Sequence, residues 1–540
     1  MSTTPRIPSA AVRALASLAC IAVAAAAAAC DSPAGPGARG PGPVTTPPPA
    51  PAVRPAITSL SPDTASAGRD SVALAVHGTG FVNGAVVLWN GTPLPTGFVS
   101  DRQVTTTVAA AGLARAGLSQ VTVRNPGSDT LVSGASQFRV HPRLDSLSVA
   151  SVYATGSNLA FRVTVYGAGF DSTTQVRING APRAPEFVIS PARMTVFVGG
   201  RDVAAPGRLE VAASDSLGGH SPPISVPVLP VPASPAITST HRLDLVVGDL
   251  AYSARSGRIY ASVPSRAGAR GNTLTIVDPG SGQVLASVPV GSEPRKLAVS
   301  GDGRYVYVAL DGEAAVRRYD VDTGTLGDKF AIGPAGHVVE DMEVIAGTPG
   351  SIAIARKQNG VSSRHALVFD EGVQRPTTAN SGASQLEPGE SPGVLYGYDD
   401  EGTYSERGLV RMRITPEGVS VERRVRGSLG NGSTSISYAR GRIVSNSGTV
   451  VDAATGFLMG FLGTGRAVLS DGPLDRAFFL YEQGISVFTL GAGQRLGNVE
   501  APWAAEVRAE VGSLVRWGPD GLAYRVGGHA MILRLNLGAP

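Results

Sequence analysis

Residues 293–330 read EPRKLAVSGDGRYVYVALDGEAAVRRYDVDTGTLGDKF, and this stretch predicts one complete four-stranded antiparallel sheet. Apolar and β-branched residues form short runs at 296–299, 304–309 and 315–319, and a fourth run ends near Ile332. Turns rich in glycine and aspartate separate the runs, at the short spacing typical of hairpin-connected strands. The C-terminal half of the chain looks like imperfect copies of this unit, which predicts an all-β repeat.

The pattern Asp-x-x-Ser/Thr-Gly marks the copies. It occurs at 278–282, 320–324 and 452–456, each time after a β-rich run. The first two copies start 42 residues apart and the last two 132 apart, which is three intervals of 44. Weaker copies lie at 366–372, 410–418, 485–493 and 531–537. Seven such runs, each taken as the third strand of a sheet, predict seven blades.

The best-preserved unit resembles a blade of a YVTN-type β-propeller, and this implies a seven-bladed propeller over residues 242–540. The last unit ends just after its third strand, so its fourth strand is missing. Residues 242–247 look like the fourth strand at 286–291 and have no sheet of their own. They are predicted to complete the last blade and close the ring, which removes an exposed strand edge.

An internal duplication precedes the propeller. Four landmarks recur at an offset of 89 residues: Gly78 and Gly167, Phe81 and Phe170, Asn90 and Asn179, Phe98 and Phe187. A constant offset predicts two domains of one fold, at 55–141 and 142–229, and their alternating short strands fit β-sandwiches. Each Asn-Gly pair predicts a type I′ turn, because both central residues of that turn need positive φ.

The duplicated segments resemble the IPT/TIG family of immunoglobulin-like domains. The resemblance is carried by PAITSLSP (55–62), GTGF (78–81), WNG (89–91), VTVRNP (121–126) and FRV (138–140), and the second copy is looser. It implies two immunoglobulin-like sandwiches that act as spacer or adhesion modules. Trp89 is interpreted as a core aromatic rather than as a residue that stacks on a sugar or a partner.

The N-terminus is typical of an exported protein. Residues 1–29 have a basic start and an apolar run before small residues, which predicts a signal peptide. AAAC (27–30) resembles a bacterial lipobox, which implies that Cys30 is joined to diacylglycerol, although Ala27 stands where leucine is usual. Ordinary signal cleavage and an uncleaved anchor are the alternatives, and Cys20 is the weaker lipidation candidate.

Two proline-rich segments are predicted to be linkers. Residues 30–54 form a tether after the lipidated cysteine, and 230–241 form a stiff connection to the propeller. Both cysteines of the chain lie in the first thirty residues, so no disulfide or thiol chemistry is expected in the rest. The net charge of +4 indicates no nucleic-acid partner, because that requires a concentrated basic face.

Signs of chemistry are weak. The chain has no phosphate loop, nucleophile elbow, Cys-x-x-Cys or His-Glu-x-x-His motif, and its seven histidines do not occur at metal-ligand spacing. No catalytic, cofactor-binding or metal residue is predicted, and no cofactor. The acidic runs Glu340, Asp341, Glu343 and Asp399, Asp400, Glu401 are interpreted as solvated loop carboxylates rather than a calcium site.

Other charged and inserted residues have structural interpretations. Asp278, Asp320 and Asp452 are expected to accept main-chain N–H bonds in their own turns. The arginines at 411–413 and 423–426 are expected to pair with glutamates across strands. Residues 377–407 are interpreted as a long insertion where the specificity of the protein lies.

These observations favour an exported, lipid-anchored and non-catalytic lipoprotein on the periplasmic face or surface of a bacterial cell. Its propeller would bind a protein or glycan of the cell envelope or its surroundings. The alternative is a hydrolase or lyase that acts on a polysaccharide or lactone in the propeller channel. Convergence of three or more carboxylates or histidines from different blades would favour this alternative. A third possibility is a purely structural role of residues 55–229 in an envelope assembly.

Overall fold

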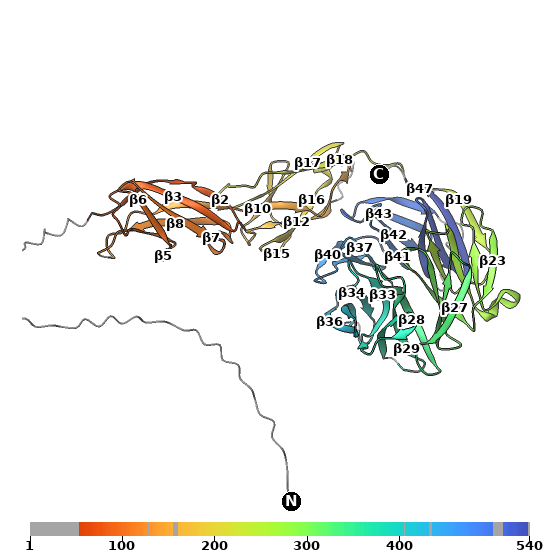
Figure 1. Cartoon of the computed structure of the whole chain (residues 1–540). Helices are drawn as coiled ribbons and strands as arrows, with labels where there is room; N and C mark the ends of the chain where they lie inside the picture. Colours follow the sequence, from red (N-terminus) through yellow and green to blue (C-terminus); the bar gives the residue numbers. More distant parts are fainter. Residues whose placement is uncertain are drawn as a thin grey trace, which may run out of the picture. The chain divides into compact units, whose positions relative to one another are not determined.

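A computed structural model describes residues 53–537, except for Ser128, 155–159, Ser362, Tyr404, 431–434 and 501–510. The predicted signal peptide, Cys30 and most of the predicted tether lie outside the described residues. The fold is all-β, as predicted, and two sandwiches precede a propeller along the chain (Figure 1). The only helical segments of the described chain are short 3-10 turns, η1 (Ala110–Leu113), η2 (Gly200–Val203) and η3 (Ser265–Arg270).

The first sandwich packs two sheets with the strand orders β1-β3-β7-β6 and β2-β9-β8-β4-β5. Its strands are β1 (Ala56–Ser61), β2 (Thr64–Ser66), β3 (Ser71–Thr79), β4 (Val86–Trp89), β5 (Thr92–Pro93), β6 (Thr96–Ser100), β7 (Gln103–Ala109), β8 (Gly117–Arg124) and β9 (Ser136–His141). Val72, Leu74 and Val76 alternate along β3 and point into the core between the sheets, as the period of a half-buried strand requires.

The second sandwich repeats this topology strand for strand, with the orders β10-β12-β16-β15 and β11-β18-β17-β13-β14. Its strands are β10 (Arg143–Leu147), β11 (Val152–Tyr153), β12 (Phe161–Ala168), β13 (Gln175–Ile178), β14 (Ala181–Arg183), β15 (Phe187–Ser190), β16 (Arg193–Val198), β17 (Gly207–Ser214) and β18 (Ile224–Leu229). The predicted duplication is therefore confirmed as two copies of one fold.

The repeated landmarks have the same local causes in both copies. A Cβ on Gly78 would lie 2.0 Å from the carbonyl oxygen of Ala56, and a Cβ on Gly167 would lie 1.9 Å from that of Arg143, so only glycine fits. Asn90 and Asn179 have φ of 47° and 48°, and the glycine after each has φ of 84°. The predicted type I′ turns are thus present, since both central residues have positive φ.

Seven four-stranded blades follow, as predicted. Blades one to three consist of β20 (Asp249–Ser253), β21 (Arg258–Val263), β22 (Thr273–Val277) and β23 (Val284–Pro289); β24 (Pro294–Val299), β25 (Tyr305–Leu310), β26 (Ala315–Asp320) and β27 (Thr325–Ala331); and β28 (His337–Val344), β29 (Ser351–Gln358), β30 (Arg364–Asp370) and β31 (Val373–Gln374). A short strand, β32 (Ala379–Asn380), also pairs with β30.

Blades four to seven have the same up-and-down order. They consist of β33 (Ala383–Pro388), β34 (Val394–Asp399), β35 (Gly408–Thr415) and β36 (Gly418–Arg426); β37 (Ile436–Ala439), β38 (Arg442–Ser445), β39 (Thr449–Asp452) and β40 (Leu458–Phe461); β41 (Ala467–Asp471), β42 (Arg476–Tyr481), β43 (Gly484–Thr489) and β44 (Arg495–Glu500); and β45 (Val511–Trp517), β46 (Gly521–Val526), β47 (His529–Asn536) and β19 (Ala236–Leu243). All seven predicted third strands are third in their sheets.

Ring closure occurs as predicted, but the predicted bounds of the closing strand are wrong. The fourth strand of the last blade is β19, in which Ile237 pairs with Leu535 and Leu243 with Ala530. The predicted segment 242–247 shares only its first two residues with the C-terminal end of β19. Leu245 and Val247 are instead buried in the core between the last and first blades, which explains their strand-like pattern. The predicted linker at 230–241 correspondingly ends before Ala236.

The predicted insertion at 377–407 is wrong as well. It contains β32, β33 and β34, so most of it is the ordinary first half of the fourth blade. The longest stretch of it between strands is the connection from Asp399 to Gly408.

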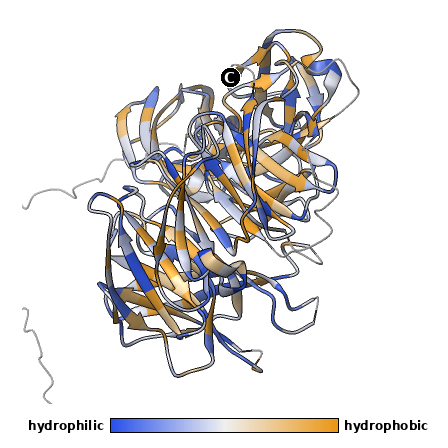
Figure 2. Ribbon diagram, turned by 90° about the vertical axis from the view of Figure 1, so that its right-hand side faces the viewer, coloured by the Kyte–Doolittle hydropathy of each residue, from blue (hydrophilic) through white to orange (hydrophobic). Residues whose placement is uncertain are grey.

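The core of the propeller lies between neighbouring blades. Tyr260 of the first blade, for example, packs with Val306 and Val308 of the second. Hydrophobic and hydrophilic residues alternate along many of the strands (Figure 2). The first strand of each blade contacts the first strand of the next, in the closed circle β20, β24, β28, β33, β37, β41, β45 and back to β20. We call these seven strands the inner ring.

Candidate functional site

The repeated aspartates have the predicted structural role. The carboxylate of Asp278 accepts the N–H of Ser281 at 2.9 Å, that of Asp320 accepts the N–H of Asp322 at 2.9 Å, and that of Asp452 accepts the N–H of Thr455 at 2.8 Å. The bond from Ser281 is the largest influence on the pKa of Asp278 and lowers it. These aspartates therefore hold turns and do not form a shared site.

Trp89 is a core residue, as predicted. Its side chain is 6% exposed, and its ring meets that of Phe138 edge-on at a centroid distance of 5.1 Å. The ring therefore packs in the core, although Trp89 also lines a pocket of about 560 Å³ in the first sandwich.

The first acidic run is not a solvated loop, which corrects the interpretation from the sequence. Glu340, Asp341 and Glu343 lie on β28, in the inner ring, and Asp341 is buried. The register with β29 shifts between Val339 and Asp341, so Glu340 is an extra residue in the strand.

Carboxylates from three blades meet at the inner ring. Asp249 comes from the first blade, Asp341 and Glu343 from the third, and Glu387 from the fourth. We call these four residues the inner-ring carboxylates. Lys296 of the second blade reaches Asp341 with its Nζ at 3.1 Å from Oδ1, and the charges of Asp249, Asp341 and Glu387 all act on Glu343.

Most inner-ring carboxylates connect one blade to the next through hydrogen bonds. The main-chain N–H of Leu297 donates to Asp249 at 2.9 Å, and that of Leu386 donates to Asp341 at 2.9 Å. The main-chain N–H of Tyr438 donates to Glu387 at 3.1 Å, and in each pair the acid lies on the preceding blade. The inner edge of a blade would otherwise present unpaired N–H groups, so these bonds satisfy buried donors.

Burial and mutual repulsion shift the protonation of this cluster. Burial raises the pKa of Glu387 to about 8, and it raises the pKa of Glu343 well above its usual range, with the charges of Glu387 and Asp341 adding to the effect. Burial alone would lower the pKa of Lys296, but the charges of Asp341 and Asp249 outweigh burial and raise it. These shifts favour the protonated form of both glutamic acids and the charged form of Lys296.

Two of the three acids in the second acidic run, Asp399 and Asp400, pair with arginine side chains, which also corrects the interpretation from the sequence. Arg364 places Nη1 2.7 Å from Asp400, and its main-chain N–H donates to Glu401 at 2.6 Å. Arg424 pairs with Asp399. Across β35 and β36, Arg411 and Arg413 pair with Glu422, as predicted. These groups stabilise the fourth blade and are not free ligands.

The second sandwich contacts one face of the propeller. In an antiparallel blade the first-to-second and third-to-fourth turns lie on the same face. The sandwich contacts the third-to-fourth turns at 453–457 and 490–494, and Arg442, which directly follows the first-to-second turn of blade five. We call this face of the propeller the docked face. The opposite face, built by second-to-third connections and by connections between blades, is called the open face.

Polar contacts at this junction are numerous. Arg193 of the sandwich places Nη1 2.8 Å from Asp452, and Arg162 donates to the carbonyl oxygen of Met459 at 2.8 Å. Gln494 exchanges two hydrogen bonds with the main chain of Tyr153, each of 2.9 Å. No motif in the sequence signals these contacts, because the partners are hundreds of residues apart.

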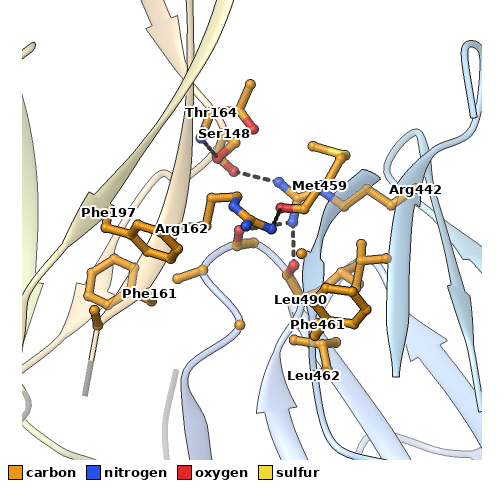
Figure 3. Close-up of a pocket in the computed structure, with 16 residues that line it drawn as sticks. Ser148, Phe161, Arg162, Thr164, Phe197, Arg442, Met459, Phe461, Leu462 and Leu490 are labelled. Carbon is orange, nitrogen blue, oxygen red and sulfur yellow. Dashed lines mark hydrogen bonds between the residues drawn. The ribbon is translucent and has the colours of Figure 1, made fainter. Parts of the chain in front are cut away.

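A pocket of about 250 Å³ lies at the junction (Figure 3). We call it the junction pocket. Its wall carries the side chains of two arginines and a group of apolar residues, namely Arg162, Arg442, Phe197, Met459, Phe461 and Leu462. A second pocket of about 210 Å³ adjoins it, because Ser148, Arg442, Met459 and Gly491 line both.

Arg442 is 8% exposed, and all its hydrogen bonds go to main-chain carbonyl oxygens. It donates from Nη1 to Leu490 and to Gly491 (2.9 Å), and from Nη2 to Ser148 (3.3 Å). Burial lowers the pKa of Arg442, and the charges of Asp475 and Asp452, which line the second pocket with it, offset burial only in part because neither acid forms an ion pair with it. Figure 3 shows this guanidinium group between the two domains.

Within the described part of the chain, no group of three or more His, Cys, Asp or Glu side chains is arranged to hold a metal ion. No helix among the described residues is both long enough and apolar enough to cross a membrane.

Comparison with protein families identifies the first sandwich. Residues 55–140 match the model of the IPT/TIG domain. These residues form a TIG domain. The match agrees with the predicted resemblance, and the second sandwich shares the topology of this TIG domain strand for strand.

Solved structures also match a part of this chain at low sequence identity. The hydrazine synthase of Kuenenia stuttgartiensis is 12% identical with a TM-score of 0.42, and the match covers 56% of this chain and 99% of that one. The WD40 repeats of RRP9 are 14% identical with a TM-score of 0.42, covering 56% and 100%. A comparison with curated proteins finds no match.

Proposed function

We propose that the protein is an exported, lipid-anchored and non-catalytic lipoprotein whose propeller binds a protein or glycan partner at the bacterial cell envelope. Cys30 carries the lipid, the proline-rich segment after it is a tether, and the sandwiches are spacer or adhesion modules. A TIG domain joined to a β-propeller supports a protein-interaction or adhesion module.

The observation that carries the proposal is the placement of the sandwich contacts. They involve turns of the docked face, which leaves the open face for a partner. Exposed residues of the open face include Arg266 and Arg270 on η3, and Val361 between β29 and β30. A face that combines basic and apolar side chains in connections of varied length is suited to selective recognition.

The binding proposal is tested with the full chain as bait against envelope extract and a glycan array. We expect a partner to be enriched, and the double substitution Arg266→Glu and Arg270→Glu to reduce its recovery. Arg255→Glu, which reverses an exposed charge in a docked-face turn, is the matched control and should leave recovery unchanged. If no partner is enriched, or if Arg255→Glu is the only variant that reduces recovery of the partner, binding at the open face is contradicted.

The anchor is tested by labelling cells with a fatty-acid analogue and by detergent partitioning. Cys30→Ser should abolish both the label and membrane association, since a lipid chain supplies roughly 0.8 kcal/mol per buried methylene. Cys20→Ser is the control and should change neither. Retention of the label in the Cys30 variant would refute lipidation at this residue.

A second function, a hydrolase or lyase acting on a polysaccharide or lactone, is favoured by one observation. Carboxylates from three blades converge at the inner ring, and the raised pKa of Glu343 and of Glu387 suits a general acid. The hydrogen bonds from Leu386 and Tyr438 explain Asp341 and Glu387 structurally, but Glu343 has no such role. Turnover of a polysaccharide or lactone panel that disappears in Glu343→Gln, with folding intact, would establish this function over the first.

A further inference from the structure

The junction between the second sandwich and the propeller carries an excess of buried positive charge. Three arginines there have carboxylate partners: Arg162 pairs with Glu186, Arg193 with Asp452 and Arg440 with Asp475. Arg442 and Arg476, which are 8% and 4% exposed, form no ion pair with any carboxylate of the described chain. Their hydrogen bonds go to carbonyl oxygens and, for Arg476, also to the hydroxyl of Tyr153 at 3.0 Å.

A buried guanidinium group with no carboxylate at ion-pair distance is costly, because carbonyl dipoles and the charges of the more distant Asp475 and Asp452 replace only part of the hydration that is lost. Arg442 lines both pockets at the junction. Its three hydrogen bonds use three of the five N–H donors of a guanidinium group, so donors remain for a ligand in the pocket. An anion placed there would complete the local charge balance.

The remaining lining of the junction pocket is apolar. Phe461 is 65% exposed and Phe197 is 46% exposed, although both are large hydrophobic side chains. They lie in the pocket wall with Met459 and Leu462 (Figure 3). Exposed aromatic side chains gathered around one cavity mark a binding surface more often than scattered ones do.

We propose that the junction pocket binds a small amphipathic anion, with its carboxylate at Arg442 and its apolar or aromatic body against Phe461 and Met459. The pocket volume of about 250 Å³ suits a molecule with a single ring or a short chain. This site is separate from the open face, and the proposal does not depend on the partner that the propeller binds.

The test uses the full chain and isothermal titration calorimetry with 3-phenylpropionate and octanoate as probes. We expect at least one carboxylate to bind with a Kd of about 1 mM or lower. The neutral alcohol 3-phenylpropanol, which lacks the charge, and inorganic phosphate, which lacks the apolar body, should bind roughly tenfold more weakly. Absence of binding by both carboxylates, or equal binding by either comparison compound, would overturn the proposal.

Variants locate the site. Arg442→Gln should weaken binding of the carboxylate by about tenfold or more, because a charge-assisted hydrogen bond is lost. Phe461→Ser removes an exposed side chain, so it should preserve the fold while it weakens binding. Val373→Ser, an exposed apolar residue outside the pocket, is the matched control and should bind as the unaltered protein does. If Arg442→Gln does not fold, full affinity in Phe461→Ser would by itself refute the site.

Discussion

Gln494 binds the main chain of Tyr153 as a neighbouring strand would. Its Oε1 accepts the N–H of Tyr153 and its Nε2 donates to the carbonyl oxygen of the same residue, both at 2.9 Å. The ring of Tyr153 is buried in the core of blades six and seven, although the residue belongs to the second sandwich. The sandwich is therefore a packed part of the propeller's docked face.

Gln494→Ala should loosen this junction. The substitution leaves the buried N–H and carbonyl of Tyr153 without their partner, which costs about 1–3 kcal/mol. We expect faster hydrogen exchange at the Tyr153 amide and a lower melting temperature. Gln374→Ala, at an exposed position on β31, is the control. An unchanged exchange rate at Tyr153 would contradict the role given to Gln494.

Loss of β19 should open the ring. Two fragments, one beginning at residue 231 and one at residue 244, both lack the sandwiches and differ only in the closing strand and the residues just before it. The shorter fragment exposes the edge of β47 and should melt on the order of 10 °C lower or aggregate. Equal melting temperatures in differential scanning calorimetry would refute closure by β19.

Stability should fall as the pH rises from 5 to 9. Glu343 and Glu387 have a raised pKa in the folded protein, so the folded state binds more protons than the unfolded state does. The two glutamic acids contribute fully to the free energy of unfolding below pH 4.5, the ordinary pKa of a glutamic acid. This contribution is lost as the pH rises through the pKa of the folded protein, which is about 8 for Glu387.

Thermal melts at several pH values check this dependence. The double substitution Glu343→Gln and Glu387→Gln should flatten the curve, whereas Glu482→Gln, at a half-exposed surface ion pair, should not. A slope that survives the double substitution would mean that other groups control the pH dependence.

Lys296→Met should be costly although methionine fits a partly buried site. It leaves the carboxylates of Asp341 and Asp249 without their cation, and breaking one side of a buried pair costs about 3–5 kcal/mol. Denaturant titration should show the loss, and Lys357→Met, outside the inner ring, should show little. Adding Asp341→Asn to Lys296→Met should recover part of the stability. A loss no larger than that of Lys357→Met would contradict the pairing.

The sequence predicts the interior of the propeller better than its periphery. Third strands are largely buried, three of them end in Asp-x-x-Ser/Thr-Gly turns, and the spacing of these three locates the other four. Outer strands such as β19 and β27 are exposed or half-buried over nearly all their length and carry few apolar residues, so their sequences show no clear hydrophobic period. For this reason the sequence predicts the closing strand at 242–247, where apolar residues alternate, and not at β19.

The sites depend on contacts that no local pattern encodes. A charged run such as Glu340, Asp341 and Glu343 predicts a solvated loop, but these residues lie on β28, because the strands of the inner ring carry polar side chains in their interior. Arg442, Phe461 and Ser148 come together only when the second sandwich meets blades five and six. The sequence shows an abundance of arginine and gives no sign of which ones are buried.

The pairing of Leu243 with Ala530 also dictates when the molecule can become complete. The ribosome makes β19 before any of the other propeller strands and makes its partner β47 last. β19 therefore has no partner strand until β47 has been synthesised, so the ring cannot close before that point. Premature termination of synthesis before β47 therefore leaves β19 without its partner strand, and the resulting ring of blades stays open.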